Sequence, residues 1–236
     1  YVVCDRENHA SIYDGCKLSF GHMVRYRHSD MEDLESVLSK IPDSAGRLIV
    51  TDGVFSMSGD IAKLPEIVKL AKKYEARVMV DDAHGLGVIG EGGRGTANYF
   101  GLEDEVDIYM GTFSKSLASL GGYMASSAAV ADFVMHSSRP YIFSASMPPA
   151  NCACALAALR VLEKEPERPK HLLALSQYVQ DGMTKRKIPH RETTVPIVPV
   201  YTYEPFRTLT IAKTLYEEGV YVNPVLPPAT PPAECL

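Results

Sequence analysis

The sequence has no long apolar run and no large excess of charge of either sign. A helix that crosses a bilayer needs about 20 consecutive apolar residues, and no stretch of the chain is that long. The N-terminus also lacks the basic, apolar and small-residue zones of a signal peptide. The formal net charge of −5 gives no electrostatic reason to expect a nucleic-acid partner. These absences predict a cytoplasmic protein with no membrane span.

Cysteines are few, and their spacing does not indicate a metal site. There are five, an odd number, and no two of them share a metal-like spacing. Cys152 and Cys154 lie in an alanine-rich stretch that is typical of a helix, where residues two apart point to different faces. We therefore expect buried, reduced thiols.

The length of 236 residues, 46% of them hydrophobic, allows one sizeable core, or one core and part of another. Tyr1–Cys4 already has a strand pattern, with no lead-in and no initiating Met. The sequence stops at Glu234–Leu236, where a new apolar segment begins. We expect a fragment, or a chain described without both of its ends.

Short apolar runs alternate with stretches whose apolar residues recur at helical spacing. The runs predict strands at Tyr1–Cys4, Arg47–Thr51, Arg77–Val80 and Val106–Met110. Helices are expected between them at Met31–Lys40 and Leu64–Tyr74. The alternation predicts an α/β fold with a mostly parallel sheet that is covered on both faces.

A second region is expected after a proline-containing break at Glu165–Pro169. Its order of elements predicts a smaller α+β domain, so that residues 1–165 and 166–236 form two domains. The expected elements are helices at Asn151–Glu163, His171–Lys187 and Thr208–Glu218, strands at Val195–Tyr201 and Val220–Val222, and a proline-rich Asn223–Pro232.

Polar side chains follow three of the predicted strands, where ligands bind in α/β sheets. Arg77–Val80 leads into Asp81, Asp82 and His84, and Val106–Met110 leads into a loop with Thr112, Ser114 and Lys115. Arg47–Thr51 leads into Asp52–Ser56. Carboxylates after a buried strand need a partner, because an unpaired buried charge is costly.

Four of these residues suit pyridoxal phosphate. That cofactor needs a lysine amine for its aldehyde and a carboxylate that keeps its pyridine nitrogen protonated, which Lys115 and Asp81 would supply. Its phosphate needs hydroxyls and backbone N–H groups, which are available at Thr112 and Ser114.

The ring of the cofactor also needs a donor for its oxygen, which could be Ser56 or His84, and a flat group such as His9. Each residue alone has an ordinary structural interpretation. A loop lysine is usually a solvated surface group, Asp81 and Asp82 could cap a helix or bind a metal, and the histidines could be structural. Their position at successive strand ends favours the cofactor site.

The loop after Asp81–His84 is rich in glycine. Gly85–Gly90 and Gly90–Gly95 both match the G-x-G-x-x-G pattern. In dinucleotide-binding folds that motif follows the strand directly and opens a helix, which Asp81–His84 prevents here. We reject that interpretation, although a non-catalytic nucleotide-binding module remains the alternative from a different class.

Four segments in order resemble the signatures of the α-oxoamine synthases, fold-type I pyridoxal-phosphate enzymes of the class II aminotransferase-like group. They are Thr51–Asp60, Val80–Val88, Gly111–Lys115 and Phe143–Pro149, and Asn8–Ser11 and Asn223–Ala229 also match. The resemblance covers essentially the whole chain. It implies a three-layer αβα large domain of fold type I, followed by the start of the small domain.

The resemblance implies a catalytic role for Lys115, which would hold the cofactor as a Schiff base and, once released, move the substrate α-proton. Asp81 would pair with the pyridine nitrogen. His84 and Ser56 would contact the ring oxygen, and His9 would stack on the ring and help orient the substrate carboxylate.

The resemblance also implies an obligate homodimer with shared active sites. Thr112 and Ser114 would bind the phosphate within one subunit, whereas Ala145 and Ser146 would reach the phosphate of the neighbouring subunit.

The reaction implied is the condensation of alanine, serine or glycine with an acyl-CoA, usually with decarboxylation. Asp81–Gly85 favours 8-amino-7-oxononanoate synthase, whereas Gly111–Gly122 and His136–Pro140 are closer to some serine palmitoyltransferase-like members. We favour the first. A serine palmitoyltransferase-like or glycine C-acetyltransferase-like member and an aminotransferase on the same fold are alternatives. Intact Lys115, Asp81 and His84 argue against a degenerate regulatory subunit.

Two parts of the family pattern lie outside the sequence. The resemblance places a glycine-rich phosphate-binding segment before Tyr1 and an arginine for the substrate carboxylate after Leu236. We therefore expect activity of the full-length protein and not of these residues alone.

Overall fold

A computed structural model describes residues 1–230 and 234–236. The chain divides into two compact units. Unit 1 comprises Tyr1–Phe55 and Ile61–Lys170, and unit 2 comprises Ser56–Asp60 and His171–Leu236. The assignment of residues 1–165 and 166–236 to a cofactor-binding and a partial small domain stays a prediction.

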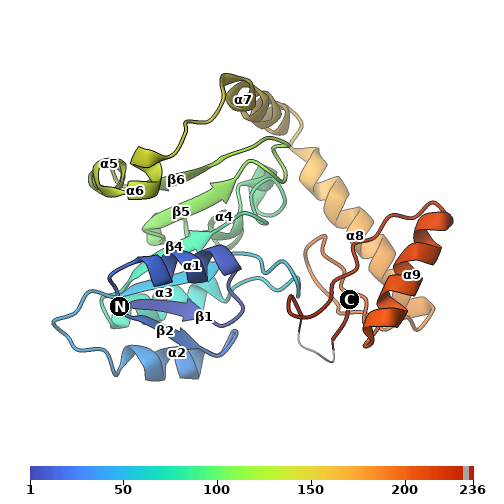
Figure 1. Cartoon of the computed structure of the whole chain (residues 1–236), viewed down its shortest axis with the longest axis horizontal. Coiled ribbons are helices and arrows are strands. Elements are labelled where there is room, and N and C mark those ends of the chain that lie inside the picture. Colours follow the sequence, from blue (N-terminus) through green and yellow to red (C-terminus); the bar gives the residue numbers. More distant parts are fainter. Residues whose placement is uncertain (231–233) are drawn as a thin grey trace. The chain divides into compact units, whose positions relative to one another are not determined.

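Unit 1 is built on a six-stranded sheet (Figure 1). Neighbouring strands are parallel throughout, except that the last pair is antiparallel. The spatial order is β2 (Met23–Tyr26), β1 (Val2–Asp5), β3 (Leu48–Asp52), β4 (Arg77–Asp81), β5 (Ile108–Thr112) and β6 (Gly122–Ser126). The predicted α/β fold is confirmed, with four of these strands expected from the sequence and the two edge strands not.

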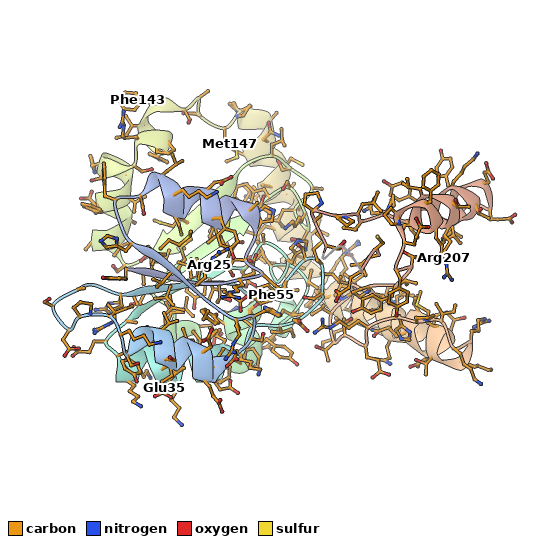
Figure 2. All side chains as sticks on the ribbon, turned by 60° about the horizontal axis from the view of Figure 1, so that its bottom comes forward. Arg25, Glu35, Phe55, Phe143, Met147 and Arg207 are labelled. Carbon is orange, nitrogen blue, oxygen red and sulfur yellow. The ribbon has the colours of Figure 1, made fainter. Side chains whose placement is uncertain are left out.

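The helices of unit 1 cover both faces of this sheet. They are α1 (Ala10–Leu18), α2 (Met31–Leu38), α3 (Leu64–Lys73), α4 (Thr96–Phe100), α5 (Ala128–Ser137), α6 (Arg139–Phe143) and α7 (Pro149–Lys164), with short 3₁₀ turns η1 (Glu91–Gly93) and η2 (Glu103–Glu105). Figure 2 shows α1 and α2 on opposite sides of the strands.

The alternation of side chains along each strand explains the two layers. Val3 and Ile49 pack in one core with Leu34 of α2 and Ile67 of α3. The residues that follow them, Cys4 and Val50, pack on the other face in a smaller cluster with Ile12 of α1. Sequence neighbours on β1 and β3 therefore belong to different cores.

Helix α2 begins at a carboxylate cap. The Asp30 side chain accepts the backbone N–H of Asp33 at 2.9 Å, which satisfies one of the donors that a helix leaves unpaired at its start. The cap accounts for the predicted start of this helix at Met31.

Unit 2 contains most of α8 (Glu167–Lys185), which starts in unit 1, and α9 (Pro205–Glu217). The strand predicted at Val195–Tyr201 is wrong: its only pairing in the described chain is an isolated bridge between His190 and Val200. Pro196 and Pro199 lack the N–H that a ladder needs.

The strand predicted at Val220–Val222 is also wrong, because the Val220 N–H donates to Leu215 at the end of α9. Of the proline-rich Asn223–Pro232, residues 231 and 232 lie outside the described part of the chain.

All five cysteines are free thiols, as expected. The prediction that they are buried holds for Cys4, Cys16 and Cys235 and is wrong for Cys152 and Cys154. The latter two lie on α7, of which only Ala155 is buried. Among residues 1–230 and 234–236, no helix combines the length and apolar character that a membrane crossing requires.

Candidate active site

The carboxyl ends of three neighbouring strands place polar residues at one edge of the sheet. Asp52 and Asp81 are paired residues in the register of β3 and β4. Asp81 in turn pairs with Met110 of β5, two residues before Thr112. This is the edge at which α/β sheets bind ligands. The strand register alone brings Asp52, Asp81 and the end of β5 together there.

Lys115 lies on the turn that joins β5 to β6. The Thr112 hydroxyl accepts the Ser114 backbone N–H at 3.2 Å, lies 2.8 Å from the Ser114 Oγ and contacts the Gly121 carbonyl at 3.2 Å. The Ala118 N–H donates to the Lys115 carbonyl at 3.1 Å. The turn therefore holds two hydroxyls beside the lysine, as the sequence predicted.

The ionisations of Lys115, of two acids and of two histidines are linked. Burial raises the pKa of Asp81, and the hydrogen bond from the Ala83 N–H and the nearby Lys115 and His9 oppose that rise. Burial lowers the pKa of Lys115, and the carboxylates of Asp81 and Asp52 oppose it. Burial, together with the nearby Lys115 and His9, lowers the pKa of His84 to about 4. Four predicted site residues therefore form one cluster with Asp52: Lys115, Asp81, His84 and His9.

His9 is the N-cap residue of α1. Its Nδ1 accepts the Ser11 backbone N–H at 3.3 Å and lies 2.8 Å from the Ser11 Oγ. Its own backbone N–H donates to the Asp52 Oδ2 at 2.8 Å. The ring itself is exposed, so its position is set by contacts at its backbone and at one ring nitrogen.

Asp82 plays a different part from its neighbour Asp81. Its Oδ2 accepts the Thr96 backbone N–H at 2.7 Å, and its Oδ1 accepts the Thr96 hydroxyl at 2.6 Å. Asp82 is therefore bonded to the first residue of α4. Within the described residues no group of three His, Cys, Asp or Glu side chains suits a metal ion. The helix-capping alternative raised from the sequence applies to Asp82.

The glycine-rich loop closes tightly around the site. A Cβ on Gly95 would lie 1.9 Å from the Asp82 Oδ2. Gly87, at a φ of +76°, would bring a Cβ to 2.5 Å from the Cβ of Ser116, the residue after Lys115. The glycines thus permit close packing of the loop against Asp82 and against the lysine turn.

The Gly87→Ala substitution tests this packing. Because the added Cβ meets backbone strain and the Ser116 side chain at once, we expect it to lower the free energy of unfolding by about 2–4 kcal/mol. Gly101→Ala is the matched control, since Gly101 also has a positive φ of +66° but faces open space. It should cost only about 1 kcal/mol. Urea denaturation measures both, and equal losses would contradict a packing role for Gly87.

The remaining predicted residues lie on other segments of the chain. Ala145 and Ser146 are exposed, on the segment between α6 and α7. Ser56 lies in a turn that belongs to unit 2. Their roles stay predictions.

Asp52 is the residue of this edge to which the sequence assigned no role. It is 5% exposed, and burial together with the charge of Asp81 raises its pKa to about 7, despite its bond from His9. Asp52 is the last residue of β3, as Asp81 is the last residue of β4, and this equivalence is the signal that could have identified it.

The pKa of His84 predicts a pH dependence of stability. The folded value of about 4 lies below the ordinary value of 6.5, so between the two the unfolded chain binds more protons. Stability therefore falls as the pH is lowered through this window. In the apoprotein, His84→Asn should remove up to about 3 kcal/mol of that loss. Urea denaturation at about pH 7.5 and 4.5 measures it, and a pH-independent difference between the two proteins would contradict it.

Comparison with known proteins decides the family. The sequence profile described as "Aminotransferase class I and II" matches residues 1–236. The chain belongs to this family. It is 49% identical, over its whole length, to a serine palmitoyltransferase of Sphingobacterium spiritivorum, and 43% identical over 98% of its length to an 8-amino-7-oxononanoate synthase of Thermoanaerobacter pseudethanolicus. The matches cover 59% and 58% of those relatives.

Solved structures agree with this family membership. The whole chain matches 60% of the S. paucimobilis serine palmitoyltransferase solved with bound PLP–myriocin aldimine, with a TM-score of 0.95 and 38% identity. It also matches 67% of an 8-amino-7-oxononanoate synthase of Francisella tularensis, with 99% of the chain covered, a TM-score of 0.83 and 26% identity. The resemblance to α-oxoamine synthases is confirmed. The chain spans about three fifths of the length of the curated relatives it matches.

Proposed function

We propose that the full-length protein is a pyridoxal-phosphate-dependent C-acyltransferase of the α-oxoamine synthase type. It would condense alanine, serine or glycine with an acyl-CoA. The observation that carries the proposal is the cluster of Lys115, Asp81 and His84 beside the hydroxyls of Thr112 and Ser114. An amine, an acid and two phosphate-binding hydroxyls at one edge of an α/β sheet are the groups that this cofactor requires.

The donor set fits the cofactor group by group. Thr112 and Ser114, whose oxygens lie 2.8 Å apart, would hold the phosphate. Lys115 would hold the aldehyde carbon, and Asp81, which is 5% exposed, would face the pyridine nitrogen. Bound there, pyridoxal phosphate supplies an electron sink for the charge that develops when the amino acid loses its α-proton.

The shifted pKa values of Lys115, Asp81 and His84 suit the roles proposed for these residues. Burial lowers the pKa of Lys115, which increases the fraction of neutral amine that can accept a proton at Nζ. Burial also raises the pKa of Asp81, and a positive charge beside it would favour the ionised carboxylate. Because its pKa is about 4, His84 is neutral near pH 7 and can donate one ring N–H to an oxygen without carrying charge.

A homodimer with shared active sites is part of the proposal. Three aromatic side chains on α5 and α6 are exposed, Phe133 by 68%, Tyr141 by 64% and Phe143 by 80%. Figure 2 shows Phe143 at the outer edge of these helices. Apolar surface of this kind supports an interface with another chain, and Ala145 and Ser146 follow directly after it. A cytoplasmic location stays a prediction.

The relatives support two substrate choices. Those named serine palmitoyltransferase reach 49% identity, and those named 8-amino-7-oxononanoate synthase reach 45%. The serine palmitoyltransferase-like alternative is thus supported at least as well as the 8-amino-7-oxononanoate synthase-like reaction favoured from the sequence. The residues of the cluster serve either reaction.

The test is incubation of the full-length holoprotein with alanine, serine and glycine, each with acyl-CoA thioesters of increasing chain length. Release of free CoA that depends on both substrates is the expected result, and the best pair identifies the reaction. Turnover of a 2-oxo acid without CoA release would instead indicate an aminotransferase. Failure to bind pyridoxal phosphate at all would favour the nucleotide-binding alternative.

A further inference from the structure

The start of α1 is joined to the end of β3 by three hydrogen bonds that link side chains to backbone. The Asn8 Nδ2 donates to the Val50 carbonyl at 2.7 Å, and the Asp52 N–H donates to the Asn8 Oδ1 at 3.1 Å. The third is the bond of 2.8 Å from the His9 N–H to the Asp52 Oδ2. Asn8 and Asp52 are both buried, so this joint is held away from solvent.

The joint determines where the imidazole of His9 lies. The His9 backbone is attached to Asp52, and its Nδ1 accepts the Ser11 N–H. His9 is exposed, so the position of its ring depends on the hydrogen bonds at its backbone and at Nδ1.

Burial of the Asp52 carboxylate costs free energy, which interactions at this position must offset. It pairs in register with Asp81, and the charge of that second acid acts against its ionisation. A carboxylate that served only to cap α1 could lie at the surface, as Asp30 does for α2 with 31% of its side chain exposed. Placed at the strand end, it connects the histidine to the edge of the sheet where Asp81 and Lys115 meet.

We propose that Asp52 is a positioning residue that holds His9 against the ring of the bound cofactor, by accepting the His9 backbone N–H. The inference rests on the proposed function, because it needs the cofactor to occupy the edge formed by β3, β4 and β5. It adds Asp52 to that site, and it explains why Asn8 directly precedes His9: both residues bind the end of β3.

A competing role for Asp52 is purely electrostatic. Its carboxylate acts on the ionisation of Lys115, and this effect depends on its charge. The two roles separate in two substitutions. Asp52→Asn keeps an oxygen that can accept the His9 N–H but removes the charge, whereas Asp52→Ala removes both.

The experiment measures the dissociation constant of pyridoxal phosphate for the full-length apoprotein, by absorbance titration. We expect Asp52→Ala to weaken binding about tenfold, the value of one hydrogen bond to a charged group. Asp52→Asn should stay within about threefold of the wild type. In a His9→Ala background, which retains the backbone N–H but has no ring, Asp52→Ala should cause no further loss.

Asp30→Ala is the matched control, since it removes another carboxylate that accepts a backbone N–H at a helix start. It should leave cofactor affinity unchanged. If Asp52→Ala does not fold, Asn8→Ala can replace it, because it disturbs the same hydrogen-bonded joint. Asn8→Ala should weaken the binding of pyridoxal phosphate when His9 is present and should have no effect in the His9→Ala background.

The outcomes distinguish the inference from the function on which it rests. Equal losses in Asp52→Asn and Asp52→Ala would overturn positioning in favour of the charge. A loss that persists in the His9→Ala background would overturn it in favour of general structural support. Normal affinity of Asp52→Ala would overturn both roles while leaving the proposed function intact, and only a wild type that binds no pyridoxal phosphate would remove the function itself.

Discussion

Replacing Lys115 with alanine is expected to abolish turnover in the full-length protein, with kcat at least about 10³-fold lower. Lys115 lies beside Asp81 and the Thr112–Ser114 hydroxyls and would both hold the cofactor and carry the proton. Loss of the amine removes both duties at once. The measurement is CoA release under saturating amino acid and acyl-CoA.

A second measurement on Lys115 does not depend on knowing the substrate. Borohydride reduction of the wild-type holoprotein should attach pyridoxal phosphate irreversibly to the peptide that contains Lys115, which mass spectrometry identifies. Lys115→Arg keeps a positive charge but has no nucleophilic amine, so it should lose the attachment as Lys115→Ala does. Lys40 is an exposed lysine in a turn, and the control Lys40→Ala should keep the attachment at Lys115. Attachment at any other lysine would contradict the assignment.

Much of the fold could be predicted because the central strands of unit 1 are buried on both faces. Ile49, Val50, Val78 and Val80 are all at most 3% exposed, and parallel strands of this kind form continuous apolar runs. The strands that were not expected lie at the two edges of the sheet. There β2 includes the exposed Arg25, and β6 consists largely of small residues with low strand preference.

The part of the site that lies at strand ends could be predicted from the sequence. Asp81, Thr112 and Lys115 each follow an apolar run closely, and the parallel register brings them to one edge. The bond between His9 and Asp52 joins residues 43 positions apart, and no local pattern shows which strand end the start of α1 will meet. The same holds for Asp82, whose partner Thr96 lies beyond the whole glycine-rich loop.

Asp81→Asn is expected to lower kcat about 10²–10³-fold while leaving the fold intact. The Asp81 Oδ1 accepts the Ala83 backbone N–H at 3.1 Å, and an asparagine oxygen can accept it as well. What the substitution would remove is the negative charge that, under the proposed function, would keep the pyridine nitrogen protonated, so the electron sink would be weaker. The effect should appear in kcat and in the absorbance of the bound cofactor, and little in the free energy of unfolding.

Asp82→Asn provides the comparison, because the two carboxylates are adjacent in the sequence and both are buried. Asp82 accepts two hydrogen bonds from Thr96 and is closely surrounded by glycines. In Asp82→Asn, the amide nitrogen that replaces one carboxylate oxygen would face a hydrogen-bond donor of Thr96. We expect a loss of about 1–3 kcal/mol in the free energy of unfolding, with kcat of the folded protein within about threefold of wild type. If Asp82→Asn instead reduced kcat as strongly as Asp81→Asn at unchanged stability, the separation of a chemical from a structural carboxylate at this strand end would be wrong. Urea denaturation and steady-state kinetics on the same two preparations decide between these results.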